Sequence, residues 1–232
     1  MGAESDQGTT HIAAIVFDFD YTLADSSPGV VICARHALAE LGLPTATAEA
    51  IRATIGLSLE ASLVALAGKE HAALGSDYRR AFIGKADHVM TDSTTLLPGA
   101  REAIETLHRA GVPLAIVTNK LRYRVLEVLR REDLAGTFGT IVGAGDVMGA
   151  DGETVQKPNP APLLMAIEVL GAPAKHALYV GDSPTDAETA RRAGVRFVAT
   201  LAGVTPPEAF DAYPVWRTVS IVGELPLLLG LS

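Results

Sequence analysis

Short runs of apolar residues rich in Val and Ile alternate along this chain with longer segments whose apolar side chains recur at helical spacing. The short runs predict buried strands over 12–17, 113–118, 140–143, 177–181 and 196–200. The helical spacing predicts helices over 99–110, 121–131 and 160–170. Strands and helices in this alternation favour an α/β fold, with a Rossmann-like parallel sheet covered by helices on both faces.

One stretch, residues 27–93, interrupts this alternation because its spacing is helical throughout. Candidate helices cover 30–41, 47–55, 59–66 and 76–90. The stretch follows the first strand, at the edge where parallel sheets bind ligands, so we expect a small all-helical cap domain that acts as a lid. The alternative is a structural embellishment. The α/β core then consists of 11–26 and 94–232, and the polar residues 1–10 are expected to form a flexible tail.

Composition narrows the possible partners. The formal net charge of −8 disfavours nucleic acid and anionic lipid surfaces. A single cysteine, Cys33, excludes an intramolecular disulfide and a thiolate metal site, which is typical of a reducing cytoplasm. No apolar run approaches the roughly 20 residues of a membrane-spanning helix. We therefore expect a cytoplasmic protein without membrane or nucleic-acid partners, either a monomer or a homodimer.

Polar side chains follow the first two strands of the predicted core at the point where each strand ends. Asp18 and Asp20 come directly after the first strand, and Thr118 and Asn119 follow the second. Carboxylates two residues apart at a sheet edge can face one cleft. Taken singly, an Asp-x-Asp pair also suits a turn, and a Thr-Asn pair also suits a helix cap.

Two further motifs occur later in the chain. Lys157 precedes two prolines that stiffen the approach to a helix, and Asp182 and Asp186 follow the strand over 177–181. Each residue alone has an ordinary structural explanation, as a surface lysine or a helix start. Their occurrence in this order, always at a strand end or before a helix, predicts one shared site.

These motifs together resemble the haloacid dehalogenase superfamily, and within it the phosphatases with a helical cap after the first strand, such as phosphoglycolate phosphatases. The resemblance covers nearly the whole chain after residue 10. It implies that Asp18 is the nucleophile and Asp20 the general acid and base. It also implies that Thr118, Asn119 and Lys157 bind the phosphate. The magnesium site that it implies consists of Asp18, Asp20, Asp182 and Asp186.

Phosphoryl transfer gives a physical reason for this set of residues. A phosphate monoester dianion repels a carboxylate. Asp18 can therefore attack only if Lys157 and a metal ion cancel the negative charge on the phosphoryl oxygens and on the nucleophile itself. Mg²⁺ prefers oxygen ligands, here the carboxylates and the backbone carbonyl of Asp20. Attack would form an aspartyl-phosphate, and Asp20 would transfer protons in both steps. We expect the Thr22 hydroxyl to orient Asp20.

Substrate contacts are harder to locate from sequence. Many relatives have Gly where this chain has Tyr21, so we expect a differently shaped turn there, with Tyr21 lining the cleft. Further candidates come from the cap and from the segment after Thr118, and they are Arg52, Ser58, Glu60, Lys120 and Arg122. A closing cap favours a small phosphorylated metabolite, with phosphoglycolate the first to test. The alternatives are a phosphomutase of the β-phosphoglucomutase type and a catalytically silent binding protein of the same fold.

Overall fold

The computed structural model describes residues 12–231 and contains a six-stranded parallel sheet, which confirms the predicted fold class. In spatial order its strands are β5 (Thr140–Val142), β4 (Leu114–Val117), β1 (Ala14–Phe17), β6 (Ala177–Gly181), β7 (Arg196–Thr200) and β8 (Val215–Val219). All neighbours are parallel, with Phe17 opposite Ile116 on one side and Val180 on the other. The first strand of the chain is therefore in the middle of the sheet.

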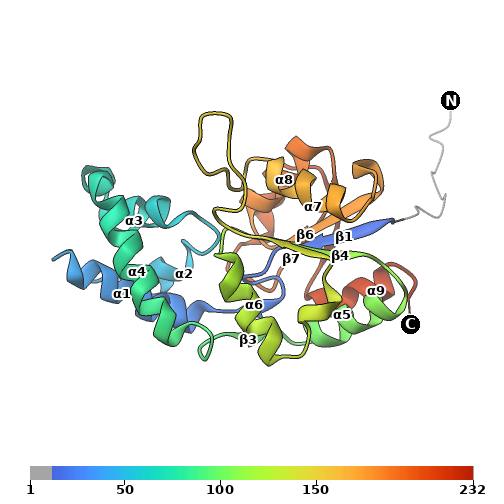
Figure 1. Cartoon of the computed structure of the whole chain (residues 1–232), viewed down its shortest axis with the longest axis horizontal. Helices are drawn as coiled ribbons and strands as arrows, with labels where there is room; N and C mark the ends of the chain where they lie inside the picture. The colour runs from blue at the N-terminus through green and yellow to red at the C-terminus, as the bar shows by residue number, and fades with distance from the viewer. Residues whose placement is uncertain (1–11, 232) are drawn as a thin grey trace.

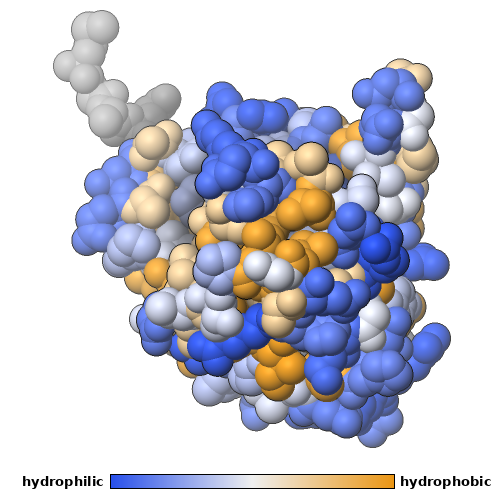
Figure 2. Space-filling view, turned by 90° about the vertical axis from the view of Figure 1, so that its left-hand side faces the viewer, coloured by the Kyte–Doolittle hydropathy of each residue, from blue (hydrophilic) through white to orange (hydrophobic). Residues whose placement is uncertain are grey.

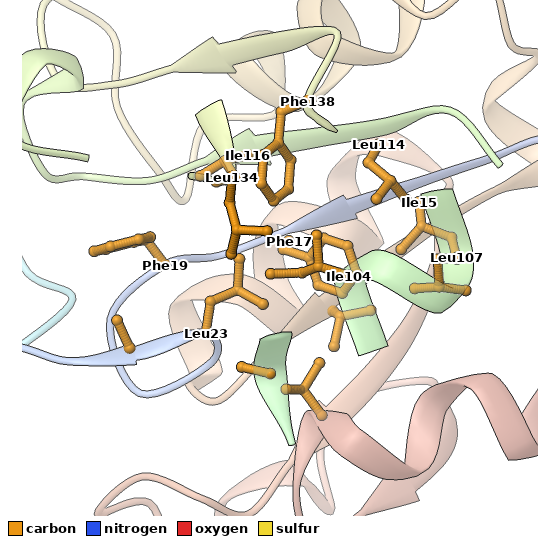
Figure 3. Packing of buried hydrophobic residues seen from close by; sticks show 14 of the residues in the cluster. Ile15, Phe17, Phe19, Leu23, Ile104, Leu107, Leu114, Ile116, Leu134 and Phe138 are labelled. Atoms are coloured by element: carbon orange, nitrogen blue, oxygen red, sulfur yellow. The ribbon is translucent and has the colours of Figure 1, made fainter. Parts of the chain in front are cut away.

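Helices cover both faces of the sheet (Figure 1). Successive side chains of a strand point to opposite faces, so Ile15 and Phe17 pack on one face and Val16 on the other. The first face is covered by α5 (Ala100–Arg109), α6 (Arg122–Arg131) and α9 (Leu225–Leu228), and the second by α7 (Ala161–Val169) and α8 (Pro184–Ala193). Figure 3 shows the first of these packed clusters, in which Ile104 of α5 lies against the strands.

The helical cap forms a layer of its own beside the sheet, at the left of Figure 1. It consists of α1 (Ser27–Glu40), α2 (Ala48–Arg52), α3 (Leu59–Ala67) and α4 (Gly75–Val89), with a 3₁₀ helix over Lys69–Leu74. A separate apolar cluster holds it together, with Leu38, Leu63 and Tyr78 fully buried at its centre. Viewed from the cap end, the surface shows a hydrophobic area near its centre, surrounded by hydrophilic residues (Figure 2).

Two chain segments connect the cap with the sheet, and they pair as a short antiparallel ribbon of β2 (Ala24–Asp25) and β3 (Thr95–Leu96). All four cap helices fall within 27–93, and the division of the chain into domains at these positions stays a prediction. The tail expected over residues 1–10 lies outside the described residues. No helix among residues 12–231 is long and apolar enough to cross a membrane.

Candidate active site

Three aspartates meet at the carboxyl ends of the two central strands. Asp18 directly follows β1, Asp182 directly follows β6, and Asp186 lies in the first turn of α8. All three are buried, and a carboxylate oxygen of each lies within 4.8 Å of the others. Because β1 and β6 are paired neighbours in the sheet, residues far apart in the sequence converge on one point.

The ammonium group of Lys157 lies within this acidic cluster. Its Nζ donates to Asp18 Oδ1 at 2.7 Å and to Asp186 Oδ1 at 2.7 Å. The side chain is buried, so these ion pairs form with little solvent screening. The sequence prediction that Lys157 lies near the strand-end aspartates is met, since it joins two of them.

Asp186 is held in place by several hydrogen bonds. The Tyr179 hydroxyl lies 2.8 Å from Oδ1, and the Ser183 hydroxyl donates to Oδ2 at 2.5 Å. Ser183 in turn caps α8, whose first turn contains Asp186. Both oxygens of Asp186 thus have protein partners, whereas the Asp182 carboxylate accepts no hydrogen bond from any of residues 12–231.

The three carboxylates of the cluster outnumber its one ammonium group. Burial raises the pKa of Asp18 to about 7, although the Lys157 ammonium acts to lower it. Burial, reinforced by the charges of Asp186 and Asp18, raises the pKa of Asp182 well above its usual range. Three buried carboxylates face one ammonium, and the Asp182 carboxylate accepts no hydrogen bond from the described residues. This arrangement fits a divalent cation with oxygen ligands.

Asp20 lies outside this group of three aspartates. Its two carboxylate oxygens accept from the Lys120 ammonium at 3.0 and 3.1 Å, and Oδ1 accepts from the Ser26 hydroxyl at 2.5 Å. Lys120 also contacts Ser26 Oγ at 3.0 Å. The expected role of Thr22 is not realised in this geometry, because its buried hydroxyl makes no hydrogen bond within the described part of the chain. Lys120 and Ser26 fix Asp20 instead.

Thr118 and Asn119 follow β4 beside the cluster. Thr118 is buried at the cavity floor, and its hydroxyl accepts from the Lys120 backbone N–H at 3.2 Å. The Asn119 amide donates to the carbonyl of Gly56 in the cap at 2.9 Å, and its oxygen accepts from the Lys157 backbone N–H at 3.0 Å. Its side chain therefore joins the cap to Lys157, which leaves little of it to bind phosphate as expected.

A cavity of about 100 Å³ lies between the cap and the ends of the strands. Its core side contains Asp18, Asp20, Thr118 and Lys120. The opposite wall comes from α1, α4 and the loop before α3. Arg79, Arg124 and Gln156 also line it, although the sequence offered no signal that singled them out.

Three cap candidates, and Arg122 of the core helix α6, do not line this cavity. Ser58 caps α3 by accepting from the Ala61 N–H at 3.1 Å. Glu60 pairs with Arg79 at 3.7 Å, Arg52 lies 4.0 Å from Glu49, and Arg122 lies 3.7 Å from Asp146. The three charged side chains are thus paired with neighbouring side chains, and the expectation that the four residues contact substrate in the cleft is not supported.

Tyr21 was expected to line the cleft, but it is not among the residues that line the cavity. Its backbone φ is +57°, in the left-handed region that glycine enters readily and tyrosine enters at a steric cost. The turn therefore has a conformation that suits glycine, contrary to the altered shape expected for a tyrosine. The side chain is buried, with its Cβ close to Gly203.

Comparison with known proteins identifies the family. Residues 15–200 match the family model for haloacid dehalogenase-like hydrolases. The chain belongs to this family. It is 36% identical over 199 residues to a phosphoglycolate phosphatase of Pseudomonas syringae pv. tomato, covering 82% of this chain and 69% of that protein. It is 31% identical to a phosphoglycolate phosphatase of Shigella boydii serotype 4, covering 95% and 93% of the two chains.

A solved structure supports the same assignment. A protein of Bacteroides fragilis described as a haloacid dehalogenase-like hydrolase superposes with a TM-score of 0.86 at 38% identity, covering 92% of this chain and 99% of that one. This chain is thus a phosphatase of the haloacid dehalogenase family. Its strand-end aspartates lie where ligands bind in parallel sheets.

Proposed function

We propose that the protein is a Mg²⁺-dependent phosphomonoesterase that hydrolyses a small phosphorylated metabolite through an aspartyl-phosphate on Asp18. The observation that carries the proposal is the position of Asp18. It lies at the floor of a small cavity, beside a buried lysine and two further aspartates. A nucleophile at such a point meets a phosphoryl group that enters from the cap side.

The metal would be held by oxygen ligands. Asp18, Asp182 and the backbone carbonyl of Asp20 are the proposed ligands, and Asp186 supports them by fixing Lys157 and Ser183. When bound, Mg²⁺ supplies positive charge that offsets the repulsion between the phosphoryl oxygens and the Asp18 carboxylate. The unpartnered carboxylate of Asp182 supports this assignment.

The protein's own groups account for the remaining chemistry. Asp18 attacks phosphorus while Lys157 neutralises charge on the phosphoryl oxygens, and the Thr118 hydroxyl donates to one of them. Asp20 protonates the oxygen of the leaving alcohol. In the second step Asp20 takes a proton from the attacking water, the bond between phosphorus and the Asp18 carboxylate oxygen breaks, and inorganic phosphate and the free Asp18 carboxylate are released. The cap excludes bulk water from the cavity meanwhile.

The first experiment uses p-nitrophenyl phosphate as a general substrate. We expect nitrophenolate release with Mg²⁺, loss of activity with a chelator and poor activity with Ca²⁺, whose larger coordination sphere would misplace Asp18. Asp18→Asn should lower kcat by about 10³ or more. Asp211→Asn, which alters an exposed carboxylate that does not line the cavity, serves as the control.

Activity that survives chelation would contradict the metal site, and normal turnover by Asp18→Asn would contradict the nucleophile. Phosphoglycolate is the first natural ester to test, because the relatives carry that name. Product analysis also separates hydrolysis, which releases inorganic phosphate, from a mutase reaction, which does not. A cytoplasmic location and a monomeric or homodimeric state stay predictions.

A further inference from the structure

The cavity wall that faces the aspartates is mostly apolar. The cap contributes aliphatic and aromatic side chains from α1, the loop before α3, and α4 with the residue after it, and these include Val30, Ile55, Leu57, Phe82, Ile83 and Met90. Most of the polar groups lie on the core side, where they include Asp18, Asp20, Thr118 and Lys120, and the cap adds Thr54, Ser62 and Arg79. A bound ester would place its phosphate at the polar floor and its alcohol portion against the apolar wall.

The basic side chains of this cavity already have acidic partners. Arg124 pairs with Glu127 at 3.0 Å and also with Asp87 of α4. Lys120 pairs with Asp20, and Arg79 lies 3.7 Å from Glu60. Each of the three cations in the lining is thus matched by a carboxylate within residues 12–231. A second anionic group on the substrate would enter this space without an uncommitted positive charge to meet it.

Desolvation then discriminates between substrates. A carboxylate that moves from water into an apolar space without a partner is strongly disfavoured, whereas each buried methylene is favoured by an amount equivalent to about a fourfold gain in binding. The volume of about 100 Å³ limits the alcohol portion to a small group.

We infer that the preferred substrates are phosphate monoesters of small, uncharged alcohols with an apolar body, in preference to esters such as phosphoglycolate that carry a second acid group. This inference rests on the proposed phosphomonoesterase function and specifies its substrate class. The residues that select the substrate are the apolar cap residues, with Leu57 and Ile83 among them, and the candidates Arg52, Ser58 and Glu60 take no part.

Isobutyl phosphate and phosphoglycolate provide a matched test. The isobutyl group has the same number and branching of heavy atoms as the glycolate portion but carries no charge. We expect kcat/KM to be at least about tenfold higher for isobutyl phosphate, and to rise about threefold to fourfold per methylene from ethyl to butyl phosphate. Released inorganic phosphate is the readout, with p-nitrophenyl phosphate as the control for activity.

Two leucine variants test the role of the wall. Leu57 lines the cavity and Leu164 on α7 does not, yet each is 40% exposed, so both substitutions should be tolerated by the fold. Leu57→Ser should lower kcat/KM for isobutyl phosphate about threefold to tenfold and leave that for phosphoglycolate within about twofold. Leu164→Ser should change neither value.

The outcomes separate the two proposals. Hydrolysis of p-nitrophenyl phosphate that depends on Asp18, together with equal or better use of phosphoglycolate, would overturn the substrate class and leave the proposed function in place. In that case Arg79→Gln tests why phosphoglycolate is used well. If the variant uses phosphoglycolate poorly, Arg79 leaves Glu60 in the parent protein to bind the carboxylate of the substrate. Failure to hydrolyse any of these esters would overturn both proposals.

Discussion

At the scale of single residues, the contacts of Asp20 determine how it could work. The Lys120 ammonium and the Ser26 hydroxyl both contact its carboxylate, so the group is fixed before substrate binds. In the proposed mechanism Asp20 has opposite duties in the two steps, first as an acid and then as a base. A substitution that removes its proton chemistry should therefore affect the two steps differently.

Asp20→Asn should cause a phosphorylated enzyme to accumulate. With p-nitrophenyl phosphate the leaving phenolate needs little protonation, so Asp18 is still phosphorylated. The second step lacks its base and should slow by about 10² to 10⁴. A stopped-flow burst of nitrophenolate, followed by intact mass, should show close to one phosphoryl group per chain. Steady turnover at the parent rate, or a phosphoryl group on another residue, would contradict this assignment.

The sequence located some of these residues better than others. Asp18, Thr118 and Asp182 were placed correctly at the sheet edge because apolar runs define where buried strands end. Arg79 and Arg124 were missed, because the chain has many arginines on helices and helical spacing does not show which face meets a cavity. Tyr179 lies inside an apolar strand, where only its hydroxyl hints at a buried polar partner.

At the scale of elements, Asn119 connects the loop after β4 with the cap and with the segment that carries Lys157. Its amide group donates to Gly56 and to the Lys157 carbonyl, and its oxygen accepts from the Lys157 N–H. The position of the cap and the position of the lysine are therefore linked through one side chain.

Asn119→Asp and Asn119→Ala should separate these contacts. The aspartate keeps the acceptor for the Lys157 N–H but loses both donor bonds, so we expect KM to rise about fivefold to tenfold with a smaller change in kcat. The alanine also releases the Lys157 backbone, and kcat should fall further. Asn159→Ala removes a nearby amide whose oxygen accepts from Ala161 N–H without reaching the cap. Equal steady-state parameters in all three variants would contradict the linkage.

The elements themselves were predicted where the pattern is strong. Five core strands and the four cap helices match the sequence prediction, with differences of a few residues at their ends. The edge strand β8 was missed because the exposed Arg217 and Thr218 interrupt its apolar character, as is usual for a half-exposed edge. The ribbon of β2 and β3 was missed because strands of two residues carry no periodicity.

At the scale of the whole molecule, the cap and the sheet have separate apolar clusters with no shared members. Cys33 is the only cysteine of the chain and is fully buried in the cap cluster. Burial raises the pKa of its thiol to about 11. Since the reactive form is the thiolate, the raised pKa and the burial both protect Cys33 from alkylation.

Iodoacetamide labelling should therefore report on cap integrity. At pH 8 a pKa near 11 leaves roughly one thiol in a thousand ionised, about a hundredfold fewer than at the ordinary value. The native protein should be alkylated at least about a hundredfold more slowly than the urea-unfolded chain, and the rate should rise about tenfold per pH unit until the cap unfolds. Intact mass gives the labelled fraction. Equal rates for native and unfolded protein would contradict the buried placement of Cys33.

The central place of β1 in the sheet has a consequence for synthesis of the chain. This strand precedes both of its partners in the chain, the later of which is β6, and Asp18 meets a lysine that follows it by 139 residues. A growing chain therefore carries its nucleophile long before it carries the groups that activate it. During that interval one edge of a wholly apolar strand has no partner, and it can associate with other exposed strands until residues 177–181 emerge.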